Sequence, residues 1–258
     1  LYLGGNAFSG AIPVSFAGLN QLEVLDLSSN NLSGTLPKEL WGLSNLSSLN
    51  LSHNRFSGGV PVSIGELKGL MELNMSGCGF SGVVPGSLAS LSRLRSLELS
   101  KQSLSGELPF ELFGMPSLQI VALQENKFSG NVPEGFSSLS SLEYLNLSSN
   151  FFSGVIPATY GFLRSLVVLS LSDNRISGSI PVELGNFSAL QVLEIRRNHL
   201  TGQIPDDFSR LSNLEKLDLG ENDLAGEIPS DISNSSSLDI LLLDRNNISG
   251  HIPGSLAK

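Results

Sequence analysis

The chain has 258 residues, a formal net charge of −9 and a charged fraction of only 15%, with 27 glycines. Nucleic-acid binding relies on clustered Lys and Arg side chains, so this balance argues against it and against non-specific attraction to an anionic membrane. No segment resembles a signal peptide, and no apolar run reaches the length of a membrane span. Cys78 is the single cysteine, and the cysteine count alone favours a reducing compartment.

An internal repeat of 24 residues runs through the sequence without insertion or deletion. A leucine opens each full unit, from Leu22 to Leu238, and a glycine stands three residues before each regularly spaced proline, from Gly10 to Gly250. Eleven of the 12 prolines keep this spacing: Pro13, Pro37, Pro61, Pro85, Pro109, Pro133, Pro157, Pro181, Pro205, Pro229 and Pro253. Agreement over the whole chain predicts a stack of equivalent structural units.

The unit that opens at Leu22 gives the predicted elements in chain order. Leu25 and Leu27 lie two residues apart, which predicts a short strand with both side chains on its buried side. Gly34 supplies a backbone conformation that residues with a Cβ avoid. Pro37 suits the first position of a short helical turn. Because one unit buries too little apolar surface to offset the entropy of ordering its residues, neighbouring units must share strand hydrogen bonds and core.

One position of the repeat carries asparagine in most units. A buried amide there can donate to backbone carbonyls of adjacent turns. Cys78 and Gln102 replace the asparagine in two units, and we interpret Cys78 as an equivalent residue with a weak S–H donor. The alternative is a reactive or metal-binding thiol. The asparagines are Asn6, Asn30, Asn54, Asn126, Asn150, Asn174, Asn198, Asn222 and Asn246.

The pattern LxxLxLxxNxLSGxIPxxLxxL resembles the plant-specific class of leucine-rich repeats, as found in the ectodomains of plant receptor-like kinases and receptor-like proteins. The resemblance covers the whole chain. The Ser-Gly-x-Ile-Pro portion separates this class from ribonuclease-inhibitor-like and toll-like repeats. Residues 108–113 (LPFELF), 121–126 (VALQEN) and 132–138 (VPEGFSS) are similar to the MUSTACHES-type receptor kinases.

The resemblance implies an α/β repeat solenoid: a leucine-rich-repeat right-handed superhelix with parallel β-strands on the concave face and short 3-10 or helical turns on the convex face. It also implies display in the apoplast, on the extracellular face of the plasma membrane, as part of a single-pass receptor whose membrane span and kinase would follow Lys258. The paired-cysteine caps of the family are missing. Residues 1–258 are therefore expected to form one array of about eleven repeats, the first and last partial, within a longer ectodomain. The expected extracellular location replaces the reducing compartment that the cysteine count alone favours.

N-glycosylation sequons point to the same location. The repeat phrases NLSG and LNLS also generate such triplets automatically. Asn186 and Asn234 fall on predicted convex segments that could carry a glycan easily, whereas a glycan on Asn50, Asn74 or Asn146 would cover part of the strand face. The candidates are Asn31, Asn45, Asn50, Asn74, Asn146, Asn186, Asn234 and Asn247.

Catalysis within this segment is not supported. His53 and His199 lie six repeats apart, which is about 29 Å at about 4.8 Å per strand, whereas hydrogen-bonded catalytic partners need about 3 Å. No metal-ligand spacing, phosphate-binding loop or activated nucleophile is evident. The segment is predicted to be no enzyme and to need no cofactor and no metal.

Binding information must therefore lie in the variable strand positions, which form columns along the stack. The most distinctive columns combine aromatic, aliphatic and basic residues, the usual anchors of protein interfaces. Arg197 stands between Asp173 and Glu221 in its column, so a cross-strand charge ladder is an equal explanation for it. Arg175 and Arg196 are better candidates because their column neighbours are not acidic. The candidate ligand-binding residues are Tyr144, Phe151, Val168, Arg175, Val192, Arg196, Arg197 and His199.

The leading hypothesis is the ligand-recognition module of a plant receptor kinase, which binds an extracellular peptide or protein through its concave or lateral surface and could engage a shorter leucine-rich-repeat co-receptor. Many peptide-hormone receptors of the family carry an Arg-x-Arg pair on one strand. The matching positions here hold Val192 and Glu194, or Ser96 and Glu98, so a free peptide carboxylate is not specifically supported. The alternatives are a secreted protein similar to polygalacturonase inhibitors and a structural spacer within a longer ectodomain.

Overall fold

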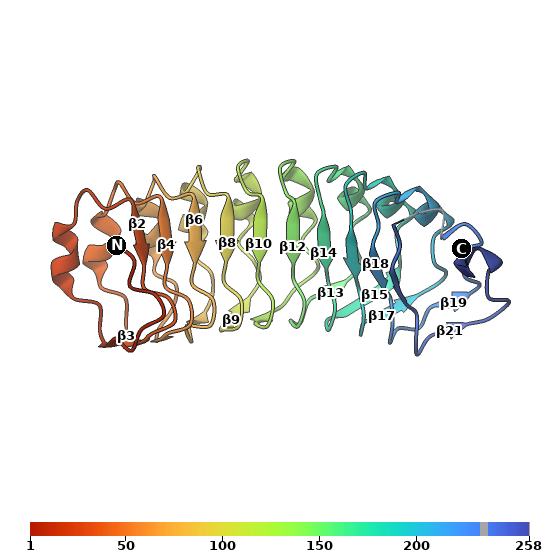
Figure 1. Ribbon diagram of the computed structural model, residues 1–258, viewed down its shortest axis with the longest axis horizontal. Coiled ribbons are helices and arrows are strands. Elements are labelled where there is room, and N and C mark those ends of the chain that lie inside the picture. The colour runs from red at the N-terminus through yellow and green to blue at the C-terminus, as the bar shows by residue number, and fades with distance from the viewer. Residues whose placement is uncertain (233–236, 258) are drawn as a thin grey trace. The chain divides into compact units, whose positions relative to one another are not determined.

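The computed structural model describes residues 1–232 and 237–257, and it divides into two compact units, Leu1–Phe128 and Ser129–Lys258. Each unit is a stack of 24-residue repeats, and Figure 1 shows the strands within each unit as successive parallel rungs. Within the described residues, the repeats contribute a main strand, a second short strand and a 3-10 turn. The predicted leucine-rich-repeat solenoid, with parallel strands and short 3-10 turns, is confirmed.

The first unit holds two sets of strands. The main ones pair in parallel in the order β2-β4-β6-β8-β10, and successive Cα partners are 24 residues apart, as in Leu25 opposite Leu49. They are β2 (Val24–Asp26), β4 (Ser48–Asn50), β6 (Glu72–Asn74), β8 (Ser96–Glu98) and β10 (Ile120–Ala122). The second short strands are β1 (Ser9–Gly10), β3 (Asn31–Gly34), β5 (Arg55–Phe56), β7 (Ser81–Gly82), β9 (Ser103–Gly106) and β11 (Lys127–Phe128).

The second unit repeats this plan. Its main strands pair in the order β12-β14-β16-β18-β20. They are β12 (Tyr144–Asn146), β14 (Val168–Ser170), β16 (Val192–Glu194), β18 (Lys216–Asp218) and β20 (Ile240–Leu242). The second short strands are β13 (Ser153–Gly154), β15 (Arg175–Ser179), β17 (His199–Thr201), β19 (Ala225–Gly226) and β21 (Asn247–Ile248).

Short 3-10 turns follow the prolines. Pro37 is extended, with φ −69° and ψ 138°, and stands just before its turn rather than at the predicted first position within it. Its carbonyl accepts the hydrogen bond of the Leu40 N–H, so the proline contributes the first acceptor and needs no donor of its own. The turns of the first unit are η1 (Val14–Gly18), η2 (Lys38–Gly42), η3 (Val62–Glu66), η4 (Gly86–Ser90) and η5 (Phe110–Gly114). Those in the described part of the second unit are η6 (Glu134–Ser138), η7 (Ala158–Phe162), η8 (Val182–Asn186), η9 (Asp206–Arg210) and η11 (Gly254–Ala257).

The core of each unit is built from the repeated leucines. Leu145, Leu169, Leu193 and Leu217 occupy the centres of four neighbouring strands and are completely buried. The residues on either side of each leucine point the other way, as the two-residue period of a strand requires. The core therefore fixes the register of the columns on the opposite side of the strands.

A ladder of side-chain amides joins successive repeats. The Asn174 amide donates to the carbonyls of Leu147 in the preceding repeat and of Leu171 in its own, at 3.0 and 3.1 Å. Its Oδ1 accepts the N–H of Phe152 at 3.0 Å. Other ladder asparagines repeat this geometry, for example Asn54. The predicted role of this position is confirmed.

The two exceptional ladder residues keep part of the pattern. The Cys78 thiol lies 3.0 Å from the Leu51 carbonyl, the acceptor that an asparagine would use. Gln102 donates to the carbonyl of Met75 and accepts the N–H of Phe80 at 2.9 Å. Burial raises the pKa of the Cys78 thiol to about 12. This thiol is therefore a neutral ladder residue, as interpreted, and not a reactive nucleophile.

Candidate ligand-binding surface

The candidate surface lies on the strands of the second unit. Tyr144 is the Cα partner of Val168, and Val168 of Val192, so these three residues form one column on β12, β14 and β16. All three are half-buried, whereas the leucines that follow them are buried. Lys216 continues the column on β18. The column thus presents an aromatic ring and two aliphatic side chains before it becomes charged.

A cation–π pair joins Phe151, two residues before β13, to Arg175, the first residue of β15. The guanidinium carbon of Arg175 lies 4.7 Å from the centre of the Phe151 ring. Both side chains are exposed, Phe151 with 43% of its surface. No carboxylate among residues 1–232 and 237–257 forms an ion pair with Arg175. The guanidinium is held in place by a ring while its charge remains available.

His199 lies on the next short strand, but the register differs from that of the main strands. Arg175 is the Cα partner of Ser153, and His199 is the partner of Ser177. Equivalent repeat positions on the short strands are therefore offset by two residues instead of facing each other. His199 is exposed, and the stacking contact is between Phe151 and Arg175 alone.

Arg196 corrects one sequence-based expectation. It was preferred to Arg197 as a ligand-binding residue because its column neighbours are not acidic, yet its guanidinium binds Glu221 at 2.6 Å and Asp244 at 2.7 Å and lies 3.5 Å from Asp218. The residues before and after Arg196 in its own column are Ser172 and Gly220, so the immediate neighbours are indeed uncharged. The side chain reaches past them, and Arg196 is held within an ion-pair network.

The reach of Arg196 depends on Gly220. A methyl group at Gly220 would overlap the Arg196 guanidinium and come within 2.7 Å of an Asp244 carboxylate oxygen. Arg196 therefore lies across the space that a side chain at Gly220 would fill, and it meets Asp244 from 48 residues away. Its position connects two repeats that are not neighbours.

Arg197 belongs to a charge ladder, as one of the two explanations predicted. It pairs with Asp173 at 3.4 Å and with Glu221 at 3.2 Å, and Glu221 also pairs with Arg245 at 3.4 Å. All four residues have positive φ, between 52° and 55°. This backbone shape recurs immediately before the ladder amide and places the four side chains in one row.

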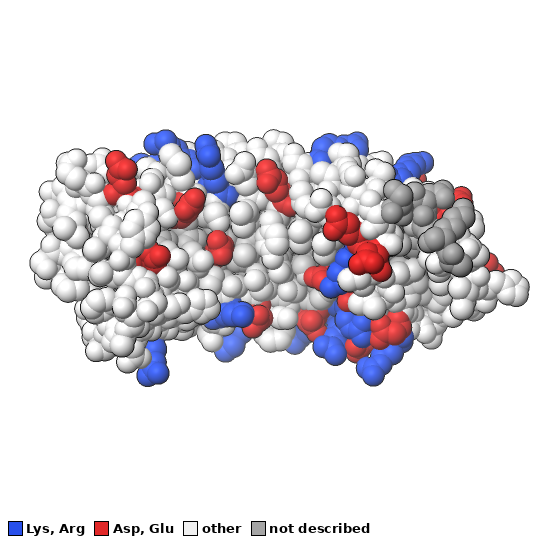
Figure 2. Space-filling model, in the orientation of Figure 1, with Lys and Arg blue, Asp and Glu red and all other residues white. Residues whose placement is uncertain are grey.

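The ion pairs shift the pKa of their members. Hydrogen bonds from Arg196 and then Arg197 lower the pKa of Glu221, and a hydrogen bond from Arg196 lowers that of Asp244. The hydrogen bond to Glu194 raises the pKa of Lys216. Figure 2 shows acidic and basic side chains interleaved over the part of the second unit that holds β15, β17 and β18 in Figure 1. The charges in this network are thus largely matched.

The predicted sequons differ in whether their amide nitrogen is already engaged. Asn45 donates to the Asn20 carbonyl, Asn74 to Glu98 and Asn146 to the Tyr144 hydroxyl. Asn31 and Asn247 are exposed on short strands, and Asn186 ends η8. Asn50 is half-buried on β4, where its Oδ1 accepts hydrogen bonds from Ser52. Asn234 lies outside the described residues.

Within the described residues, no set of three or more His, Cys, Asp or Glu side chains is placed to hold a metal ion. In the same residues, no helix has the length and apolar character needed to span a bilayer. The described surface offers an aromatic and aliphatic column, a stacked guanidinium and an ion-pair network.

Family models described as leucine-rich repeat match residues 1–56, 116–176, 164–224, 188–248 and 69–91. No curated protein matches the sequence significantly. Among solved structures, the Arabidopsis receptor kinase HAESA, in complex with the peptide hormone IDA and the co-receptor SERK1, is 35% identical with a TM-score of 0.94. The match covers 100% of this chain and 43% of that one.

The plant peptide hormone receptor RGFR1, in complex with RGF2, is 33% identical with a TM-score of 0.89, over 99% of this chain and 45% of that chain. A plant ice-binding protein is 26% identical with a TM-score of 0.75, over 97% and 81%. The chain thus spans less than half the length of the two receptors it matches. The chain belongs to the leucine-rich-repeat family, and its repeats match those of plant receptor kinase ectodomains.

Proposed function

We propose that this chain is a ligand-recognising part of the extracellular region of a plant receptor kinase, and that it binds a peptide or protein through the strand surface of its second unit. Two receptors of matching fold are complexes with peptide hormones, and one also contains a co-receptor. We extend this to the present chain as an expectation: an extracellular location, a peptide or protein ligand, and a shorter leucine-rich-repeat partner.

The observation that carries the proposal is the Arg175–Phe151 pair. Arg196 and Arg197 are engaged by carboxylates, so they present little unmatched charge to a ligand. Arg175 is exposed, stacked at 4.7 Å on a ring and not paired with a described carboxylate. Together with the apolar column of the same repeats, it suits a ligand that combines an acidic group with an aromatic or aliphatic one. We place Tyr144, Val168 and Val192 on the apolar side of this site, with His199 at its edge.

Selection from a random dodecapeptide library displayed on phage tests the site without assuming a hormone. We expect selected peptides to be enriched in Asp or Glu next to an aromatic or aliphatic residue. Their affinity should fall by about tenfold in Arg175→Ala and also in Phe151→Ala. Arg55→Ala is a matched control, because Arg55 is an exposed arginine at the same repeat position in the first unit. Selected peptides that bind Arg175→Ala as tightly as the unaltered chain would refute the site.

The two alternatives predict other outcomes. A protein similar to polygalacturonase inhibitors would bind a folded enzyme and yield no acidic peptide motif that depends on Arg175. A spacer would yield no specific peptide at all. Because the same selection separates the three hypotheses, it tests the proposed function as well as the residues.

A further inference from the structure

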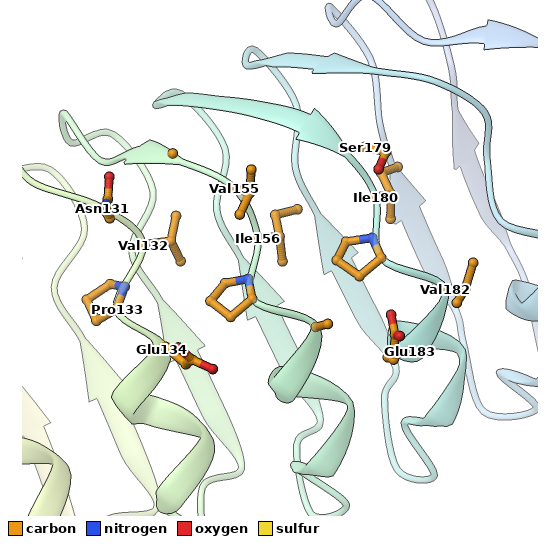
Figure 3. A pocket seen from close by; sticks show the side chains of 14 residues that line it. Asn131, Val132, Pro133, Glu134, Val155, Ile156, Ser179, Ile180, Val182 and Glu183 are labelled. Atoms are coloured by element: carbon orange, nitrogen blue, oxygen red, sulfur yellow. The ribbon is translucent and has the colours of Figure 1, made fainter.

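A groove crosses three repeats of the second unit on the side where the prolines stand. It has a volume of about 970 Å³ and is formed by residues 131–134, 154–158 and 179–183, which we call the proline groove (Figure 3). None of these residues belongs to the ligand-binding surface described above. The groove is therefore a second feature of the unit, independent of the proposed function.

The floor and rim of the proline groove are apolar. Val132, Ile156 and Ile180 form a buried row, and each is followed by a proline, which has no N–H to offer. Val155 and Val182 stand at the rim with 59% and 53% of their surface exposed. Exposed aliphatic side chains beside a hollow favour an apolar partner, because its binding removes their surface from water.

Two details of the sequence open the groove. Ala158 is the residue after the middle proline, at a repeat position that holds Glu134 and Val182 in the neighbouring repeats, so the centre is left hollow. Gly178 has φ +77°, and a methyl group on it would come within 2.9 Å of Val155 Cγ1. The missing Cβ thus lets Val155 lie against the next repeat.

The charge of the proline groove has one sign. Glu134 and Glu183 line it, no Lys or Arg does, and neither carboxylate forms an ion pair with any cation in the part of the chain that is described. Asp206 and Glu227, equally unpaired, line a second hollow of about 570 Å³ on the following repeats, together with His251. This contrasts with the strand surface of the same unit, where acidic and basic side chains are matched.

We infer that the proline groove docks an extended, basic segment of a partner protein, with one Lys or Arg side chain at each end of two apolar residues. Glu134 and Glu183 belong to repeats two apart, so they are separated by about 10 Å at the usual strand spacing. Three residues of extended chain span the same length. The segment thus has the form Lys/Arg-x-x-Lys/Arg, and the aliphatic side chains between its charges contact Val155 and Val182.

The probe is a fluorescein-labelled peptide with Gly-Lys-Pro-Val-Lys-Gly at its centre, compared with the version in which both lysines are glutamates. Fluorescence polarisation should show binding of the basic peptide only, and 500 mM NaCl should weaken it. The double variant Glu134→Gln/Glu183→Gln should raise the Kd by about tenfold. Glu39→Gln/Glu111→Gln is the matched control, since Glu39 and Glu111 hold the repeat position of Glu183 in the first unit and change the net charge equally.

Ala158→Trp fills the centre of the groove without removing a native contact, and Ala158 is exposed, so the chain should still fold. This variant should abolish binding while the circular dichroism spectrum stays unchanged. A photoreactive benzoylphenylalanine in place of the peptide valine should crosslink to residues 154–158 or 179–183. Equal binding of both peptides, crosslinks elsewhere, or a Kd unaffected by the groove variants would each overturn the proposal. So would self-association of the chain that Ala158→Trp abolishes, because the groove would then accept a second copy.

Discussion

The amide ladder gives the most direct test of how the repeats are held together, and Asn174→Ala is the sharpest perturbation of it. Asn174 is a buried residue with 8% of its surface exposed. Its amide donates to the carbonyls of Leu147, Leu171 and Ser172, and its oxygen accepts the N–H of Phe152. Alanine removes all these contacts and supplies no replacement.

The expected cost follows from those contacts. The amide donates two hydrogens, which are shared among three carbonyls, and its oxygen accepts one further hydrogen bond. The loss therefore corresponds to about three hydrogen bonds at about 1 kcal/mol each. The Phe152 N–H and the Leu147 carbonyl belong to the preceding repeat, so the change weakens the junction between repeats as well as a single turn. We expect the free energy of opening this part of the second unit to fall by about 3 kcal/mol.

Native-state hydrogen exchange measures this quantity locally, which matters because repeat arrays need not unfold in a single step. The amides to follow are those of Leu169 and Leu193, at the centres of β14 and β16. A loss of about 3 kcal/mol should accelerate their exchange by about 100-fold, since each 1.4 kcal/mol is a factor of ten. Acceleration of less than about threefold would refute the assignment of stability to the amide ladder.

Asn174→Gln is the matched control, because Gln102 fills the equivalent position naturally and keeps one donor and one acceptor contact. Its exchange rates should stay much closer to those of the unaltered chain. If Gln and Ala were equally damaging, shape and not hydrogen bonding would explain the effect.

Four further predictions concern the thiol and the ion pairs. Cys78→Asn should raise the free energy of unfolding by about 1 kcal/mol, because an amide makes stronger hydrogen bonds than a thiol at this position. A lower midpoint of urea unfolding would contradict this. The Cys78 thiol, with its pKa raised to about 12 by burial, should resist maleimide at pH 8 until urea is added, whereas labelling of native protein would refute its burial. Gly220→Ala should displace the Arg196 guanidinium, seen as a change of its Nε–H resonance by NMR; an unchanged resonance would speak against the overlap. The ion pairs lower the folded-state pKa values of Glu221 and Asp244. The stability that these carboxylates contribute is therefore present above their unfolded-state pKa values and should be lost as the pH falls through their folded-state pKa values. Urea midpoints that stay level below pH 4 would contradict this.

Most of the fold could be predicted from the 24-residue period of the sequence. Strand positions such as Leu25, the amide ladder and the parallel register follow from spacing alone, because each unit must bury the same face against its neighbours. The sequence reading put Pro37 at the first position of the 3-10 turn, whereas the turn begins at the next residue, Lys38. In a 3-10 turn, the first acceptor is the residue before the turn, and the extended Pro37 fills that role.

The candidate site was only partly predictable. The charge ladder was one of two equal explanations for Arg197, and it was visible in the sequence because the acidic partners are the next residues in its column. Arg196 was misjudged because a long side chain can cross a glycine and reach Asp244 two repeats away. A glycine at position 220 followed by an acid at position 244 indicates such an ion pair only if the length of the arginine side chain is considered. The proline groove depends on three repeats at once, so no single repeat reveals it.

The contact from Arg196 to Asp244 has a consequence for how the second unit unfolds. Solenoid stability is usually written as a sum of intrinsic repeat energies and nearest-neighbour terms, as in a one-dimensional Ising chain. Arg196 and Asp244 are 48 residues apart, so their ion pair adds a second-neighbour coupling to that sum. A second-neighbour term lengthens the segment that must open together. We therefore expect the repeats that hold Arg196 and Asp244 to open together more often than a nearest-neighbour sum predicts, through a contact that depends on the glycine at position 220.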